Sequence, residues 1–231
     1  MDPIAVDPDN HTISAEAYAE YYAQQREYRL RLAHIPPALA GCLETWRMGY
    51  GDGHDADRRT ALRLAESYIA NPETANLVLS GVAGTGKSKL AACIMSELVG
   101  GGGTGSWVAW RSTVVAIRAT YHESGGRSLN DILDEIGADT AQYMVVDDCG
   151  PIVPGDRIAR DESLFLSDLF DKRENEGLGT ITTTNSTERA LREWAGDAVV
   201  SRMTRGAVIW RGWDRMSDLR RYKSTEKETR P

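Results

Sequence analysis

The chain of 231 residues contains few cysteines, and they are widely spaced. Only Cys42, Cys93 and Cys149 occur. An odd number at this spacing excludes the paired framework of a small disulfide-rich protein and the ligand pairs of a structural zinc site. Isolated thiols suit a reducing compartment, so we expect a cytoplasmic protein.

Long apolar runs are also missing. No stretch approaches the roughly 20 residues that cross a bilayer, and the acidic start Met1-Asp2-Pro3 lacks the apolar core of a signal peptide. We therefore expect no membrane partner. An excess of positive charge is missing too, because the formal net charge is −7. This balance argues against broad, non-specific binding to nucleic acid but leaves room for a local basic stripe.

The sequence does contain a phosphate-binding loop. Residues 81–88 read G-x-x-x-x-G-K-S, after the apolar run 77–79 and before a segment of helical periodicity at 89–99. Such a loop points several backbone N–H groups at one anion. We expect Lys87 to bind the β- and γ-phosphates and Ser88 to hold Mg²⁺. The residues expected to bind ATP are Gly81, Val82, Ala83, Gly84, Thr85, Gly86, Lys87, Ser88 and Lys89.

A second motif follows about 60 residues later in the chain. The apolar run 143–146 ends in Asp147 and Asp148, which is the pattern of a Walker B strand. Asp147 would hold the Mg²⁺, and Asp148 would orient the attacking water. A strand that merely ends in two aspartates is the alternative, and the upstream P-loop favours the Walker B interpretation.

Strands and helices alternate along the rest of the chain. Besides 77–79 and 143–148, strands are expected at 106–111, 180–185 and 207–210. Besides 89–99, helices are expected at 14–33, 58–70, 113–123, 128–136, 161–175, 188–195, 197–204 and 216–222. The glycine-rich stretch 100–105 is expected to be a flexible joint. This alternation predicts a three-layer α/β fold with a mostly parallel, five-stranded sheet and a ligand at the carboxyl ends of the strands.

The expected N-terminal helix carries a stripe rich in tyrosine, and arginines crowd its end. The stripe consists of Tyr18, Tyr21, Tyr22, Tyr28 and Leu32. The helix could pack on the core with a solvated cationic end. It could also dock onto a protein partner, because tyrosine and arginine are enriched at interfaces.

Taken together, these motifs resemble AAA+ ATPases, specifically helicase loaders of the DnaC/DnaI type. The resemblance runs from about Ile35 to Tyr222 and rests on the order of its pieces. Besides the P-loop, these are Ile35-Pro36-Pro37, Met144 to Gly150, Thr183-Thr184-Asn185-Ser186, Ser201-Arg202-Met203 and Trp213-Asp214.

The resemblance implies roles for residues that the P-loop alone does not identify. Asn185 would position the water or sense the γ-phosphate, and Arg202 would reach the ATP of a neighbouring subunit. A surface arginine is the alternative for Arg202. Arg205 and Arg220 are weaker candidates for phosphate contact. The resemblance also implies an extension over residues 1–33, an ATPase domain over 34–222 with little or no lid, and a disordered tail over 223–231.

The implied function is that of an ATPase that forms homo-oligomers with ATP, binds a hexameric replicative DNA helicase and helps deliver it onto single-stranded DNA. The tyrosine-striped helix would be the helicase-docking element. DNA contact is implied for a region that combines arginine with aromatic residues. That region offers Trp110, Arg111, Arg118, Tyr121, His122 and Arg127, with a buried Trp110 and solvated arginines as the alternative.

Two departures from the family pattern qualify this expectation. Loaders usually carry Glu where this chain has Asp148, whose shorter side chain leaves the carboxylate farther from the water. We therefore expect slow hydrolysis. Some loaders carry an N-terminal zinc module, whereas only Cys42 precedes the P-loop here. An IstB-like transposition helper, a small-molecule P-loop kinase and a non-hydrolysing ATP-binding scaffold remain as alternatives.

Overall fold

The computed structural model describes residues 15–44, 46, 56–72, 76–120, 127–153, 155–205 and 207–210. Five parallel strands form one sheet in the order β2-β3-β4-β1-β5. They are β1 (Leu77–Ser80), β2 (Gly105–Ala109), β3 (Tyr143–Asp147), β4 (Thr180–Thr184) and β5 (Val208–Trp210). The described helices are α1 (Ala15–Leu32), α3 (Ala56–Ala70), α4 (Lys87–Gly100), α5 (Trp110–Ala119), α6 (Leu129–Glu135), α7 (Arg160–Asn175), α8 (Glu188–Ala195) and α9 (Asp197–Thr204).

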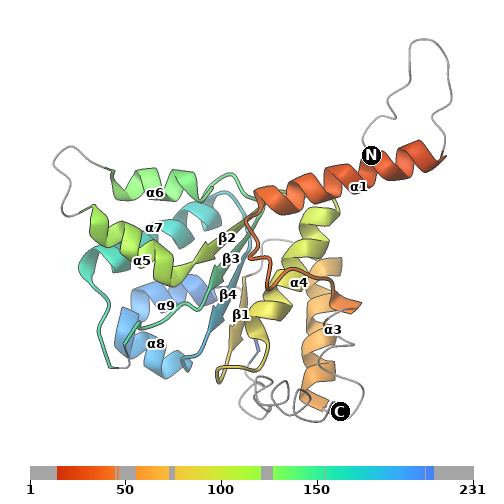
Figure 1. The fold of residues 1–231 in the computed structure, drawn as a ribbon. Coiled ribbons are helices and arrows are strands. Elements are labelled where there is room, and N and C mark those ends of the chain that lie inside the picture. Colours follow the sequence, from red (N-terminus) through yellow and green to blue (C-terminus); the bar gives the residue numbers. More distant parts are fainter. Residues whose placement is uncertain are drawn as a thin grey trace, which may run out of the picture.

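Helices cover both faces of the sheet, as Figure 1 shows: α3 and α4 lie on one face, and α5 to α9 lie on the other. Successive residues of a strand point to opposite faces. In β1, Leu77 and Leu79 join the cluster under α3 and α4, whereas Val78 joins the cluster under the other helices. A sheet buried on both faces reads as unbroken apolar runs, which explains the strand pattern of the sequence. The three-layer fold with a parallel, five-stranded sheet is confirmed.

The strand order places β4 between β1 and β3, although β4 comes after both in the chain. Thr184 pairs with Ser80 at the end of β1, and Thr182 pairs with Val146 near the end of β3. The carboxyl ends of these three strands therefore meet at one edge of the sheet. The P-loop, the two Walker B aspartates and Asn185 all follow directly from this edge.

The expected strand over 106–111 is too long at its carboxyl end, because Trp110 already begins α5. Its indole is buried, donates from Nε1 to the Gly150 carbonyl at 3.0 Å and meets the Trp194 ring edge-on, with 6.0 Å between centroids. Residues 107–109 at the end of the strand and Trp110 at the start of the helix are all apolar, so the sequence does not show where the strand ends. The structure supports the alternative in which Trp110 packs in the core.

The glycine-rich stretch after α4 forms a hydrogen-bonded turn, in contrast to the flexible joint that we expected. The N–H groups of Gly101, Gly102 and Gly103 donate to carbonyls in the last turn of α4, at 2.9, 3.1 and 3.3 Å. A helix leaves its last carbonyls without partners, and these three bonds satisfy some of them. The expected helical turn at 216–222 and the tail at 223–231 lie outside the described residues.

A buried arginine joins the amino ends of β3 and β4. Arg173 on α7 is 1% exposed and donates to the hydroxyl of Thr180 and to four backbone carbonyls at 2.6 to 3.3 Å. Burial lowers the pKa of Arg173 to about 10, so the guanidinium still carries its charge at neutral pH. The backbone dipoles, rather than a carboxylate, stabilise this cation.

The tyrosine stripe of α1 does not pack on the core, contrary to the interpretation that we considered first for this helix. Its carboxyl-terminal end contacts α4 and β2, where Ala33 is fully buried. Its amino-terminal half projects beyond the body of the molecule (Figure 1). Tyr18, Tyr21 and Tyr28 are exposed, and the Tyr18 and Tyr22 rings lie 4.5 Å apart, against each other.

Candidate nucleotide-binding site

The P-loop forms a tight turn between β1 and α4. Gly84 and Gly86 have φ angles of 83° and 96°, which only glycine adopts readily, and Gly86 is the N-cap of α4. Thr85 is buried and its hydroxyl donates to the Val82 carbonyl at 3.0 Å. The first N–H groups of a helix have no partners within the helix and attract an anion. The loop and the start of α4 thus form an anion-binding end.

Lys87 is 6% exposed and its ammonium group lies within the loop. It donates to the carbonyls of Gly81 and Val82 at 2.7 and 2.6 Å, and to Oδ1 of Asn185 at 2.9 Å. An ammonium group has three N–H donors, so a phosphate oxygen that approaches Lys87 would compete with these acceptors.

Asn185 connects the P-loop to the Walker B strand. Its Oδ1 accepts from Lys87, and its Nδ2 donates to Oδ1 of Asp148 at 2.5 Å. One side-chain amide thus joins the predicted phosphate-binding cation to the carboxylate predicted to orient water. The structure thus brings Asn185 into contact with Lys87, 98 positions away in the sequence, and with Asp148, 37 positions away.

Asp147 and Asp148 point to different partners at the end of β3. Oδ1 of Asp147 accepts from the Thr183 hydroxyl at 2.6 Å. Asp148 is exposed and has a φ of 55°, a left-handed conformation that costs free energy for a residue other than glycine. Such strain is common where a side chain must face a ligand, so the turn at Asp148 fits a functional position.

The chemistry of Ser88 and Asp147 fits a magnesium site. A hydroxyl and a carboxylate are hard oxygen ligands, and Mg²⁺ usually takes one or two such protein ligands beside phosphate oxygens and water. Ser88 is the second residue of α4, and Asp147 is the last residue of β3. Within the described ranges, no three His, Cys, Asp or Glu side chains gather into a metal site of their own.

The side chain of Lys89 points to a different part of the chain. Its ammonium group donates to the carbonyls of Leu39 and Ala40 at 2.9 and 2.6 Å. Lys89 thereby ties α4 to the segment that follows α1. The contact between Lys89 and a nucleotide stays a prediction. Because the ammonium group is bonded elsewhere, such a contact would be made by the backbone N–H of Lys89, near the start of α4.

Arg202 lies far from the P-loop of its own chain. Its Nε donates to Oδ1 of Asp171 on α7 at 2.6 Å, and its carbonyl accepts from the Asn76 side chain at 3.5 Å. Asn76 directly precedes β1, so Arg202 lies at the amino edge of the sheet, opposite the P-loop. Arg205 is bound to Glu174 by two contacts of 2.6 and 2.7 Å. The structure therefore does not bring Arg202 together with the P-loop of its own chain.

Sequence reasoning missed Thr183, which contacts both Walker B residues. Its hydroxyl accepts from the backbone N–H of Asp148 at 2.9 Å while it donates to Asp147. The run of threonines before Asn185 was the available signal, because a buried hydroxyl needs a partner. Cys149, which follows Asp148 in the chain, is buried. This burial raises the pKa of its thiol to about 12, so the thiol is inert.

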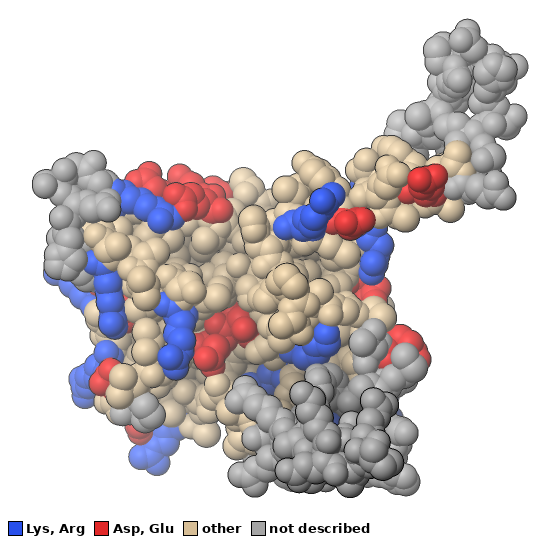
Figure 2. Space-filling view, viewed as in Figure 1, with Lys and Arg blue, Asp and Glu red and all other residues tan. Residues whose placement is uncertain are grey.

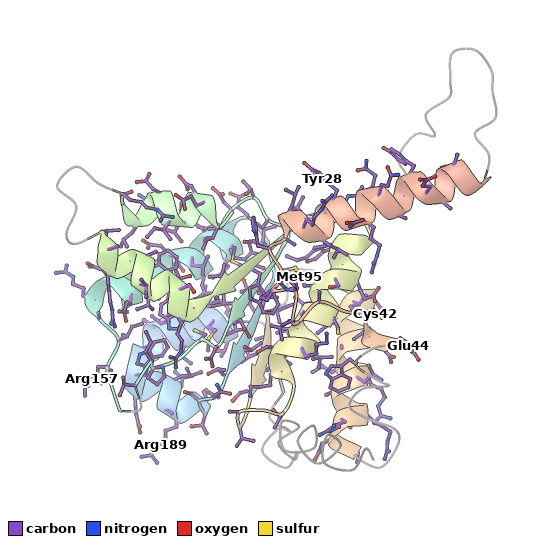
Figure 3. The ribbon with its side chains drawn as sticks, viewed as in Figure 1. Tyr28, Cys42, Glu44, Met95, Arg157 and Arg189 are labelled. Atoms are coloured by element: carbon purple, nitrogen blue, oxygen red, sulfur yellow. The ribbon has the colours of Figure 1, made fainter. Side chains whose placement is uncertain are left out.

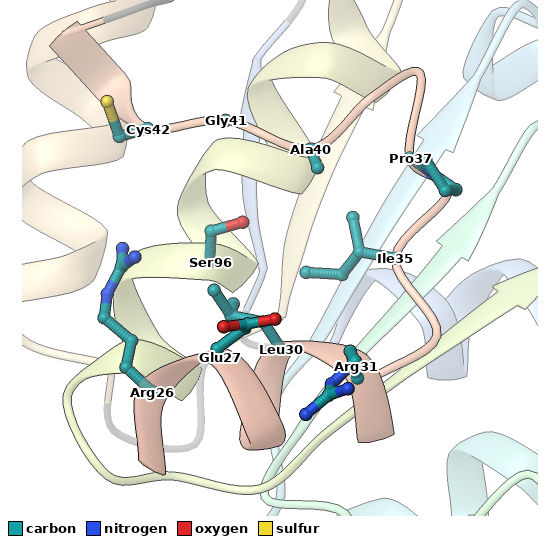
Figure 4. A pocket seen from close by; sticks show the side chains of 10 residues that line it. All are labelled: Arg26, Glu27, Leu30, Arg31, Ile35, Pro37, Ala40, Gly41, Cys42 and Ser96. Carbon is teal, nitrogen blue, oxygen red and sulfur yellow. The ribbon is translucent and has the colours of Figure 1, made fainter. Parts of the chain in front are cut away.

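A separate pocket of about 450 Å³ lies between α1, the segment after it and α4 (Figure 4). Its lining includes Arg26, Leu30, Cys42 and Ser96, and no residue of the P-loop. Ser96 is nine residues beyond Lys87, which corresponds to about 13 Å along the helix. The pocket therefore lies on the flank of α4, and it is not placed to hold a phosphate acceptor beside the P-loop.

The proposed DNA-contacting region retains its arginines but not its tryptophan. Figure 2 shows basic groups over α5 and acidic groups over α6. Arg111 and Arg118 on α5 are exposed, and Arg118 donates to the buried Glu162 at 2.8 Å. Arg127 forms an ion pair with Glu135. Tyr121 and His122 lie outside the described residues, as does Arg220.

Two further basic side chains lie on the same side of the molecule. Figure 3 shows Arg157 and Arg189 pointing away from the body, near the start of α7 and on α8. Arg189 forms an exposed ion pair with Glu193.

None of the helices in the described part of the chain is long and apolar enough to cross a bilayer.

Comparison with known proteins gives a consistent result. The model of the family described as "IstB-like ATP binding protein" matches residues 10–207. The replicative helicase loader DnaC of Escherichia coli strain K12 is 27% identical over 152 residues, which cover 65% of this chain and 59% of that protein. The chain thus spans less than two thirds of the length of the DnaC proteins that it matches first.

Solved structures show the same fold. The crystal structure of the DnaC helicase loader has a TM-score of 0.60 at 19% identity and covers 74% of this chain and 95% of its own. The crystal structure of DnaI has a TM-score of 0.59 at 22% identity, with coverages of 75% and 91%. At these identities the likeness concerns the fold alone.

Lys87 and Lys89 form a matched pair for testing the site. We expect Lys87→Ala to weaken binding of a fluorescent ATP analogue by about 30- to 150-fold, because a charge-assisted hydrogen bond is worth about 2–3 kcal/mol. Lys89→Ala should change the affinity less than about threefold, since its ammonium is bonded to carbonyls outside the loop. Equal losses in a fluorescence titration would assign the Lys89 side chain to the nucleotide site.

Proposed function

Because the chain belongs to the family of IstB-like ATP binding proteins, we propose that it binds ATP with Mg²⁺ at the P-loop and hydrolyses the ATP slowly. We propose further that ATP joins protomers into an assembly that holds a hexameric replicative helicase and places it on single-stranded DNA. The contact chain from Lys87 through Asn185 to Asp148 is the observation that supports the ATPase part. The similarity to DnaC supports the loading part.

The residues at the strand ends divide the chemistry among them. Lys87 turns from its acceptors in the protein, Oδ1 of Asn185 included, to the phosphate oxygens, and Oδ1 of Asn185 is then free. Asn185 and Asp148 then hold a water in line with the γ-phosphorus. The water oxygen bonds to phosphorus, the bond to the β-phosphate oxygen breaks, and the water proton passes to Asp148. Mg²⁺, held through Ser88 and Asp147, would neutralise charge on the phosphates.

The length of the Asp148 side chain sets the expected rate. Aspartate is one methylene shorter than the glutamate usual in loaders, and a misplacement of about 1 Å can cost about 100-fold in rate. ATP binding without rapid hydrolysis suits an assembly switch. If the short side chain of Asp148 prevented hydrolysis altogether, the protein would be an ATP-binding scaffold that does not hydrolyse ATP.

Asp148→Glu tests this explanation. We expect kcat to rise by about tenfold or more while the affinity for the ATP analogue changes less than about threefold, because the longer side chain extends the reach of the carboxylate. Steady-state release of phosphate gives kcat, and Asp148→Asn serves as the inactive control that still tolerates the left-handed backbone. A wild-type rate equal to that of Asp148→Glu would contradict the explanation.

The location of Arg202 supports catalysis between protomers. The guanidinium lies at the opposite edge of the sheet from its own P-loop, and Asp171 holds it in place. A head-to-tail arrangement could present it to the ATP of the next protomer, and such contacts form rings or open helices. An arginine supplied by a second subunit accelerates phosphoryl transfer by about 10³–10⁵ in other NTPases.

Mixing variants tests this arrangement. Arg202→Ala should keep nucleotide affinity but lose hydrolysis by about 10³-fold. Lys87→Ala should lose binding. An equal mixture of the two should regain hydrolysis that neither variant has alone, because some interfaces then combine an intact Lys87 with an intact Arg202. Arg189→Ala, on α8 and paired with Glu193 at the surface, is the control and should hydrolyse normally. Failure of the mixture to recover would remove Arg202 from the neighbouring site.

Two surfaces fit the partners of a loader. The projecting half of α1 is mostly uncharged (Figure 2) and presents tyrosines, which are frequent anchors in protein interfaces. We assign this half of α1 to the helicase. Arg111 and Arg118 on α5 could follow the backbone of single-stranded DNA, as arginines do without sequence preference. With Trp110 buried, this contact would rest on charge.

The first measurement is light scattering on a sizing column. The full chain would be mixed with its cognate replicative helicase, with and without ATP and Mg²⁺. We expect a complex whose mass depends on nucleotide, and its loss when Tyr18 and Tyr21 are changed to Ser, since these exposed rings supply apolar area. Leu164→Ser, an exposed apolar residue on α7, is the control and should leave the complex intact.

The alternative outcome points to a related protein. No complex under any condition would reject the loader and favour a transposition helper, which the family model also fits. The corresponding experiment replaces the helicase with a transposase. A small-molecule kinase has less support, because the pocket on the flank of α4 contains no P-loop residue.

A further inference from the structure

Thr183 lies at the centre of the site, and although it belongs to the segment Thr183 to Ser186 that resembles the family, neither the sequence nor the resemblance gives it a role. It is the fourth residue of β4, which lies between β1 and β3, and it is 1% exposed. A hydroxyl has one proton to donate and lone pairs to accept. Thr183 donates to Oδ1 of Asp147 at 2.6 Å and accepts from the N–H of Asp148 at 2.9 Å.

These two bonds determine the positions of both Walker B residues. The bond to Asp147 occupies one carboxylate oxygen and leaves the other oxygen for Mg²⁺. The bond from the Asp148 N–H supports the left-handed turn, with φ of 55°, that starts at this residue. The Thr183 carbonyl also accepts from the Cys149 N–H at 2.8 Å. Asp148 is therefore held by Thr183 through its backbone and by Asn185 through its side chain.

We propose that Thr183 is a positioning residue for the ATPase reaction, which orients the metal-binding carboxylate of Asp147 and holds the turn that presents Asp148 to the attacking water. This inference rests on the proposed ATPase function. Thr183 acts through the two aspartates and contacts neither the nucleotide nor the water.

The neighbouring threonine provides a matched comparison. Thr182 is equally buried at 1% exposure in the same strand, but its hydroxyl has no hydrogen-bond partner among the described residues. Threonine and valine have nearly the same shape. Thr182→Val therefore removes a buried hydroxyl that does nothing for the site, whereas Thr183→Val leaves a carboxylate oxygen and a backbone N–H without their partner.

The test uses the full chain with Thr183→Val, Thr183→Ser and Thr182→Val. We expect Thr183→Val to bind the fluorescent ATP analogue in EDTA within about threefold of wild type, to lose about 10- to 100-fold in kcat, and to need more Mg²⁺ for half-maximal activity. Thr183→Ser keeps the hydroxyl and should recover most of both losses. Thr182→Val should match wild type in kcat, Mg²⁺ dependence and thermal unfolding.

A measurement without nucleotide keeps the inference separate from the proposed function. Amide hydrogen exchange of Asp148, followed by NMR, should quicken in Thr183→Val and not in Thr182→Val. If the wild-type chain binds nucleotide without hydrolysing it, only the proposed ATPase reaction is rejected. The role of Thr183 is then tested by the gain in nucleotide affinity that Mg²⁺ gives, which Thr183→Val should lose. An active wild type with an equally active Thr183→Val, or a loss that Thr183→Ser does not recover, would overturn the role of Thr183.

Discussion

The insertion of β4 between β1 and β3 is the constraint on which the site depends. Backbone hydrogen bonds to both neighbours bring three strand ends to one edge, and each end supplies one part of the chemistry. β1 leads into the P-loop, β3 ends in Asp147 and is followed by Asp148, and Asn185 follows β4. Arg173 secures the amino ends of β3 and β4 from the other side, with carbonyls rather than a carboxylate as its partners.

Lys87 of the P-loop is connected by hydrogen bonds to the residues that follow β4 and β3. In this structure its ammonium group donates to two loop carbonyls and to Asn185, and the amide of Asn185 donates in turn to Asp148. Under the proposed function, a phosphate that competes for Lys87 would act on the same side chain that contacts Asp148.

The fold and much of the site were predictable, because both depend on local patterns. Residues 81–88 have no other common use after a strand and before a helix, and the apolar strands reveal a sheet covered on two faces. Trp110 was harder, since an apolar residue at a strand end reads the same in a strand and in a buried helix. The run of threonines before Asn185 indicates buried hydroxyls that need partners, but the partners of Thr183 could not be predicted, because they depend on which strand lies beside β4. The exposure of the tyrosine stripe of α1 depends on how far this helix extends beyond the rest of the molecule, and the spacing of apolar residues carries no information about that.

The seat of α1 on the P-loop helix has a mechanical consequence. Glycines make room for the contact: a Cβ at Gly100 would lie 2.7 Å from the Arg26 side chain, and one at Gly105 would lie 3.3 Å from Ala33. α1 has 18 residues and is therefore about 27 Å long, and it is held near one end only. Because of this length, a tilt of about 5° where α1 contacts α4 would move the tyrosine end by about 2 Å. The position of the exposed tyrosines therefore depends on how α1 packs against α4.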